Sequence, residues 1–374
     1  MIVIKGAKLS MPMRPAWIEV DLNALAANTR TAKRLAGTAA LFAVCKGDAY
    51  GCGAERVGRV MQEAGADAFA VADPEDALRL RAGGVDKPIL LFAGTTPDQA
   101  ECLAKLGIVL TVHDFEGLEA LTSSGLHADV FVEIDCGYGR LGFVPADWAR
   151  AFASLKAAPN TAVLGLYSHF SNPDSAATTA RQAAVFAHAV EDARSAGLQP
   201  RYRMIASSRV LAAYPDLTLT AIEPGRLLYG VMEGDWAALV PQQPVIKAVK
   251  SRVIQVRDLP DDFGVGYGSA ARRPAGRLRT AVAAFGFKDG IPTTLPAADV
   301  LIRGRRCPVL GSFSTEHAII DVTQNPSVEV GDEVVFVGEQ DGDQISFLDF
   351  CARNELSVLE MLQRFGRSLR RVYV

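Results

Sequence analysis

The sequence predicts an α/β fold class: a (β/α)8 barrel of the TIM type followed by a C-terminal β-rich domain. Eight short apolar runs recur up to about residue 225, and segments with helical spacing stand between most of them. After about residue 240 the pattern changes to alternating β-branched runs separated by Gly, Pro and Asp turns. The length of 374 residues suits a large barrel with an attached domain.

The barrel prediction rests on apolar runs of strand length. Intervening segments such as AERVGRVMQEAGA and PEDALRLRAGG have apolar residues at helical spacing and glycine near the C-terminal end, which is typical of helices. The last two runs, within MIASSRVLAAYP and LTAIEPG, can also be read as other structures. In chain order the runs are FAVCK, AFAVA, PILLFA, IVLTV, DVFVEI, VLGLYSHF, MIAS and LTAIEPG.

The second domain is predicted from five runs of strand character. They are VIKAVKSRVIQVRDL, RTAVAAFGF, ADVLIRGRRCPVL, AIIDVT and DEVVFVG, and helical spacing is scarce until LSVLEMLQRF. We expect an N-terminal tail over 1–15, the barrel over 16–238 and the β-domain over 239–374. The early run AWIEVDL belongs either to the barrel or to the β-domain.

Composition narrows the class of function. The chain is 49% hydrophobic and 22% charged with a net charge of −3, which favours neither nucleic acid nor an anionic membrane surface. No apolar stretch of about 18 residues or long signal-peptide core is present, so a cytoplasmic protein is expected. Six cysteines without a CxxC pair and five histidines without HExxH spacing predict reduced thiols and no metal site.

Polar residues at the predicted strand ends are the candidate site. Each has an ordinary alternative: Lys46 as a solvated charge, His169 as a hydrogen-bonded core residue, and Arg140 as a partner of Asp135. In a barrel, however, the C-terminal ends of the strands converge on one face, and the active sites of barrel enzymes lie on that face. The residues at these ends are Lys46, Arg140, His169, Ser208 and Glu223.

A lysine beside a phosphate site indicates a particular cofactor. A desolvated lysine can form a Schiff base with a carbonyl group. The segment EPGRLLYG supplies glycine and arginine, which suit a phosphate-binding turn. Together these features predict pyridoxal 5'-phosphate (PLP) bound at Lys46.

Over nearly its whole length the chain resembles the alanine racemase family, the fold-type III PLP enzymes with a PLP-binding barrel and a C-terminal β-domain. The motifs that carry the resemblance are AVCKGDAYGCG, EIDCGYGRLGF, YSHFSNPD, MIASSRVLA and IEPGRLLYG. The resemblance implies that Lys46 carries PLP as the internal aldimine and that Arg140 contacts the ring oxygen and the substrate carboxylate. It further implies that His169 stacks near the ring and that the phosphate is bound by Tyr50, Ser208, and the backbone N–H groups of Gly225 and Arg226.

The sequence departs from the family pattern at Glu223, where the family has an arginine facing the pyridine nitrogen. A carboxylate within about 4–6 Å typically favours the protonated ring by about 1–3 pKa units. Related fold-type III decarboxylases have an acidic residue at this position. The change is therefore expected to make the cofactor a stronger electron sink.

A second departure lies in AFGFKDGIP and GSFSTEHAIIDVT. Phe287 replaces the tyrosine that serves the family as second catalytic base in the partner subunit's site, and a phenyl ring cannot accept a proton. Thr315 and Glu316 replace the neighbouring Met-Asp pair, which changes the substrate-carboxylate side. Tyr267 and Tyr138 are the candidate replacements for the base.

The expected function is that of a PLP-dependent, alanine-racemase-like isomerase acting at Cα of a small or modified amino acid. One alternative is a PLP-dependent decarboxylase, retro-aldolase or other lyase on the same scaffold, and another is a PLP-binding protein without turnover. The resemblance implies a homodimer whose sites are shared between subunits, with Phe287 at the family's catalytic position and with Thr315 and Arg140 in substrate binding.

Overall fold

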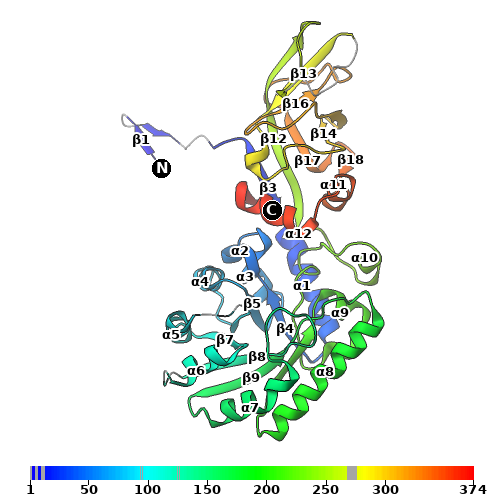
Figure 1. Ribbon diagram of the computed structural model, residues 1–374. Coiled ribbons are helices and arrows are strands. Elements are labelled where there is room, and N and C mark those ends of the chain that lie inside the picture. Colours follow the sequence, from blue (N-terminus) through cyan, green and yellow to red (C-terminus); the bar gives the residue numbers. More distant parts are fainter. Residues whose placement is uncertain are drawn as a thin grey trace. The chain divides into compact units, whose positions relative to one another are not determined.

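The computed structural model divides the chain into two compact units, which are described separately (Figure 1). One unit comprises residues 22–245, and the other combines residues 1–21 with 246–374. The predicted domain limits stay a prediction. The structure describes residues 2–4, 7–9, 13–92, 94, 96–123, 125, 127–267 and 276–374.

The unit of residues 22–245 contains a closed barrel of eight strands, all paired in parallel, so the predicted barrel is confirmed. The last strand, β11, is only two residues long, yet its pairing with β4 and β10 closes the barrel. The strands are β4 (Ala40–Val44), β5 (Ala68–Val71), β6 (Ile89–Leu91), β7 (Ile108–Val112), β8 (Ala128–Glu133), β9 (Thr161–Tyr167), β10 (Tyr202–Ala206) and β11 (Ala221–Ile222).

Helices surround this barrel, and two of them, α4 and α8, begin at a capping side chain (Figure 1). Helix α4 starts at Pro74, and the Asp73 side chain accepts the Glu75 N–H, while Ser175 caps α8 in the same way. The helices are α1 (Leu22–Ala36), α2 (Lys46–Tyr50), α3 (Ala54–Glu63), α4 (Pro74–Ala82), α5 (Pro97–Lys105), α6 (Phe115–Ser123), α7 (Trp148–Ala157), α8 (Ala176–Ser195), α9 (Ser208–Ala213) and α10 (Asp235–Leu239), with 3-10 turns at η1 (Pro145–Asp147) and η2 (Pro215–Thr218).

Aromatic side chains fill the barrel interior. Phe42 meets Phe131 edge-on at 5.6 Å, and Phe131 stacks on Tyr202 at 5.7 Å. Because this centre is packed, the strand ends rather than the middle of the barrel are available for a site. No helix in the described part of the chain is long and apolar enough to cross a membrane.

The other unit is built on β12 (Ile246–Leu259), which pairs with β3 (Ala16–Val20) and β17 along its first part and with β13 along its second. The run AWIEV forms β3 and therefore belongs to the β-rich unit and not to the barrel, which decides between the two alternatives. The remaining elements are β1 (Ile2–Ile4), β2 (Ala7–Leu9), β13 (Leu278–Ala283), η4 (Phe287–Asp289), β14 (Asp299–Ile302), β15 (Arg305–Pro308), β16 (Ala318–Asp321), β17 (Glu333–Gln340), β18 (Asp343–Ile345), α11 (Phe347–Arg353), α12 (Val358–Ser368) and β19 (Arg370–Tyr373).

Candidate active site

Lys46 begins a turn with an unusual backbone. Gly47, Asp48, Ala49 and Tyr50 all have positive φ between 51° and 64°, so α2 is a single left-handed turn. For a residue with a side chain this conformation costs roughly 1–2 kcal/mol. Hydrogen bonds fix the turn, including the Ala49 N–H to the Cys45 carbonyl at 3.0 Å. The lysine therefore stands on an ordered turn, not on a flexible one.

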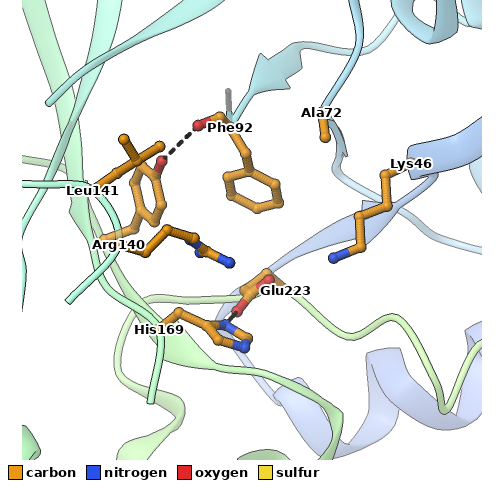
Figure 2. A pocket seen from close by; sticks show the side chains of 8 residues that line it. Lys46, Ala72, Phe92, Arg140, Leu141, His169 and Glu223 are labelled. Carbon is orange, nitrogen blue, oxygen red and sulfur yellow. Dashed lines mark hydrogen bonds and ion pairs between the residues drawn. The ribbon is translucent and has the colours of Figure 1, made fainter. Parts of the chain in front are cut away.

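Lys46 lines a cavity of about 230 Å³ at the strand ends of the barrel. Figure 2 shows the Lys46 amine and the Arg140 guanidinium pointing toward the middle of this cavity, with Glu223 and His169 beside them. The structure thus brings these four predicted residues together. The lining residues, all from the barrel unit, are Lys46, Ala72, Phe92, Arg140, Leu141, Tyr167, His169 and Glu223.

Glu223 and His169 form one polar pair in the cavity. The His169 Nδ1 lies 3.0 Å from the Glu223 Oε1, and Glu223 is only 8% exposed (Figure 2). The His169 ring also meets the edge of Tyr138, whose ring lies under the Arg140 guanidinium at 4.6 Å. His169 is therefore held by specific contacts at the rim of the cavity, which differs from an ordinary core histidine.

Arg140 faces a buried carboxylate that sequence reasoning missed. The Glu133 Oε1 lies 3.9 Å from the Arg140 Nη2, and the Glu133 Oε2 accepts the Tyr167 hydroxyl at 2.9 Å. Burial raises the pKa of Glu133, against the hydrogen bond from Tyr167 and the charge of Arg140. Asp135 instead accepts backbone N–H groups of residues 137–139. The ordinary alternative for Arg140, a pair with Asp135, is therefore wrong.

A second group of predicted residues lies around Gly225. The Ser208 hydroxyl accepts the N–H groups of Gly225 at 2.9 Å and Leu227 at 3.1 Å. A Cβ on Gly225 would lie 2.6 Å from the Tyr50 hydroxyl, so only glycine allows this approach. The Arg226 guanidinium forms an ion pair with Glu233.

Phe287 and Thr315 lie together in the β-rich unit. The Phe287 N–H donates to the Ser314 carbonyl at 2.9 Å, and the Lys288 N–H donates to the Thr315 carbonyl at 3.1 Å. Gly286 packs so closely on this segment that a Cβ would meet the Ser314 carbonyl oxygen at 2.3 Å. The Phe287 side chain remains 41% exposed.

Sequence reasoning missed Tyr167 as well as Glu133, although both stand inside quoted motifs. Glu133 opens EIDCGYGRLGF and Tyr167 opens YSHFSNPD, and they are the last residues of β8 and β9. Their position at a strand end was the available signal. Among the described residues, no group of three or more His, Cys, Asp or Glu side chains is arranged to hold a metal ion.

Two family models match almost the whole chain. The model described as "Alanine racemase, N-terminal domain" covers residues 20–233, and "Alanine racemase, C-terminal domain" covers residues 246–373. The chain belongs to the alanine racemase family. This membership makes it a PLP-dependent, racemase-like enzyme, as the sequence predicts.

Known members of the family are similar along their full length. The alanine racemase of Symbiobacterium thermophilum is 33% identical over 96% of this chain and 97% of its own. The catabolic alanine racemase of Pseudomonas putida is 38% identical over 88% and 91%. Among solved structures, alanine racemase from Streptomyces coelicolor A3(2) has a TM-score of 0.89 at 30% identity over 96% and 98%. That from Corynebacterium glutamicum has 0.84 at 29% over 97% and 100%.

The residues of this chain fit the cofactor of that family. Gly225 lies between two hydroxyls that suit a phosphate: a Cβ there would lie 2.6 Å from the Tyr50 hydroxyl, and its N–H donates to the Ser208 hydroxyl at 2.9 Å. The Lys46 amine lies 5.9 Å from the centre of the Tyr50 ring. An amine for the aldehyde and donors for the phosphate are thus close neighbours.

Proposed function

We propose that this chain is an amino-acid racemase that acts at Cα of a small amino acid placed between Lys46 and Arg140. The observation that carries the proposal is that the Lys46 amine and the Arg140 guanidinium face each other in one cavity. When bound, PLP withdraws electrons from Cα and so makes its C–H bond more acidic. Lys46 holds the cofactor and afterwards takes or returns the proton at Cα on its own side.

Arg140 would bind the substrate carboxylate. A guanidinium binds a carboxylate through two parallel hydrogen bonds, which fixes orientation as well as position. Glu133 on one side and the Tyr138 ring on the other restrict where this guanidinium lies. Substrate would thus be oriented with its Cα toward Lys46.

The phosphate would be held by Tyr50, Ser208, Gly225 and Arg226. Hydroxyl and backbone N–H donors bind a phosphate without adding a mobile side-chain charge. The Arg226 side chain is engaged by Glu233, so its contribution in the proposal is its backbone N–H.

Glu223 supports a second candidate function, a PLP-dependent decarboxylase, retro-aldolase or other lyase. A carboxylate at the pyridine nitrogen would favour the protonated ring by about 1–3 pKa units. Each unit corresponds to about 1.4 kcal/mol. The pairing of the Glu223 Oε1 with His169 keeps this carboxylate oriented in the cavity. Stronger electron withdrawal assists the breaking of other bonds at Cα as well as C–H.

The opposite side of Cα needs a proton acceptor other than Phe287. Of the two tyrosines suggested by sequence, Tyr138 contacts Arg140 and His169 at the cavity of its own chain, whereas Tyr267, in the β-rich unit, would have to act in the site of a partner subunit. We therefore favour Tyr138. Its replacement by phenylalanine is expected to slow inversion of configuration more than exchange of the Cα proton.

A homodimer with shared sites is the second part of the proposal. Phe287 and Tyr267 are large apolar side chains exposed by 41% and 71% on the β-rich unit, as expected of an interface. Sedimentation of the active enzyme should give the mass of a dimer. A monomer with full activity would rule out shared sites. A cytoplasmic location also belongs to this proposal and is checked by cell fractionation.

Incubation of the PLP-loaded enzyme with D- and L-amino acids tests the proposed reaction. A racemase converts one enantiomer of a small amino acid into the other at unchanged mass, as read by chiral chromatography and mass spectrometry. Loss of carbon dioxide or release of an aldehyde would instead establish the lyase alternative. Silence with every amino acid would leave a binding protein.

A further inference from the structure

A buried carboxylate outside the cavity contacts the left-handed turn of Lys46. Asp76 lies in the first turn of α4 and is 1% exposed. Its Oδ1 accepts the Asp48 N–H at 2.9 Å and an Arg79 N–H at 2.9 Å. Asp76 thus connects the turn to a helix of the barrel unit.

The charge of Asp76 is arranged toward the turn. Burial raises the pKa of this carboxyl, and the hydrogen bonds from Asp48, Arg79 and the Gly47 N–H oppose that rise. The Oδ2 has no partner with hydrogen-bond geometry among the described residues, although the Gly47 N–H lies close enough to affect the carboxyl. The carboxylate therefore faces two successive N–H groups of the turn.

Helix α4 does not need Asp76 for its own start. Asp73 already caps the helix by accepting the Glu75 N–H at 2.9 Å. Arg79 also has a second carboxylate partner, Glu75 at 3.1 Å. Asp76 instead accepts the part-buried Asp48 N–H at 2.9 Å, beside a backbone in a costly left-handed conformation, so its removal takes away a bond that favours that conformation.

We propose that Asp76 is a positioning residue that holds the Lys46 turn in its left-handed form and thereby sets the direction of the lysine side chain. Three residues with side chains, Asp48, Ala49 and Tyr50, persist in this conformation only if the surroundings favour it. Lys46 is the first residue of the turn, so relaxation of the turn redirects its amine. The inference rests on the proposed role of Lys46 in holding PLP.

The test compares Asp76→Ala and Asp76→Asn with Glu75→Gln, a control on the same helix that loses an Arg79 contact but does not touch the turn. Asp76→Ala should weaken PLP binding about 10- to 100-fold, as expected for a lost hydrogen bond to a charged group. Asp76→Asn keeps an acceptor for the Asp48 N–H and should weaken PLP binding only about 3- to 10-fold. Glu75→Gln should stay within about 2-fold.

Hydrogen exchange of residues 46–51 in the PLP-free proteins gives a readout that a general loss of stability would not mimic. In both Asp76 variants, hydrogen exchange should become faster in residues 46–51, while exchange in α4 stays near that of the control. The melting temperature of Asp76→Asn should also stay near that of the control. If Asp76→Ala does not fold, Asp76→Asn decides by the same measurements. Unchanged exchange and PLP affinity in the folded variants would overturn the inference.

Borohydride reduction of the wild-type holoenzyme separates the two ideas. A pyridoxyl group on Lys46 supports the proposed function, and its appearance on another lysine refutes that function. The exchange measurement on residues 46–51 still tests the contact between Asp76 and the turn.

Discussion

The turn of Lys46 and the turn of Phe287 are held by the same kind of hydrogen bond but present different side chains. Each contains a backbone N–H bonded to a buried aspartate that also pairs with an arginine: Asp76 with Arg79, and Asp289 with Arg14. One turn offers an amine inside a cavity, and the other offers an exposed phenyl ring. Both backbones are fixed, but the Lys46 side chain can exchange a proton and the Phe287 side chain cannot.

The largest effect is expected from removing the Lys46 amine, the group that distinguishes the first turn from the second. Lys46→Ala should lower the rate of turnover by at least about 10³-fold, because both cofactor attachment and proton transfer are lost. Steady-state kinetics with saturating PLP provide the measurement. Lys105→Ala, which removes an exposed lysine paired with Glu101 on α5, is the matched control and should leave the rate unchanged. A Lys46→Ala enzyme of normal rate would exclude the proposed mechanism.

Arg140 tests the substrate side of the same cavity. Arg140→Ala should lower kcat/KM about 10²-fold, since the charge-assisted pair with the substrate carboxylate is lost. Arg140→Lys should recover only part, because an ammonium lacks the two parallel donors. Arg194→Ala, on the exposed side of α8, serves as control. Equal kinetics for the alanine and wild-type enzymes would remove Arg140 from substrate binding.

Phe287→Tyr would remove the difference between the two turns. In deuterated buffer, the natural enzyme should place deuterium at Cα of an accepted D-amino acid faster than it inverts that amino acid. The new hydroxyl should raise inversion relative to exchange by about 10- to 100-fold, the lower part of the range for a positioned acid–base group. Phe263→Tyr, another exposed phenylalanine of the β-rich unit, should change neither rate. Matched rapid exchange and inversion in the natural enzyme would show that Tyr138 already acts as a fully effective base on that side and that Phe287 does not limit inversion.

Glu133 gives the smallest effect, which appears in stability. Burial raises its folded-state pKa above the ordinary 4.5, so its contribution to stability is complete at low pH and is lost as pH rises through the folded-state value. The free energy of unfolding of Glu133→Gln should therefore rise relative to that of wild type as pH rises from about 4 upward, by about 1.4 kcal/mol for each unit by which folding raises the Glu133 pKa. Melting temperatures over this pH range provide the measurement. Glu191→Gln is the exposed control. A difference independent of pH would contradict the raised pKa.

Much of the fold could be predicted because buried parallel strands are short apolar runs, and all eight appear in the closed barrel. The left-handed turn could not, since Asp48, Ala49 and Tyr50 have no intrinsic preference for positive φ and adopt it through tertiary contacts. Asp76 reads as an ordinary acidic residue in the first turn of a helix. Its role depends on a residue 28 positions earlier in the chain.

The pairing of β3 has a consequence for the order in which the protein folds. Trp17 pairs with Lys250 of β12 and with Arg370 of β19, so both partners of this early strand lie beyond the barrel residues 22–245. During synthesis the barrel can close while Ala16–Val20, with its apolar Ile18 and Val20, still lacks a neighbour. An unpaired apolar strand is prone to aggregation. The ribosome therefore releases this strand long before β12 and β19 can pair with it.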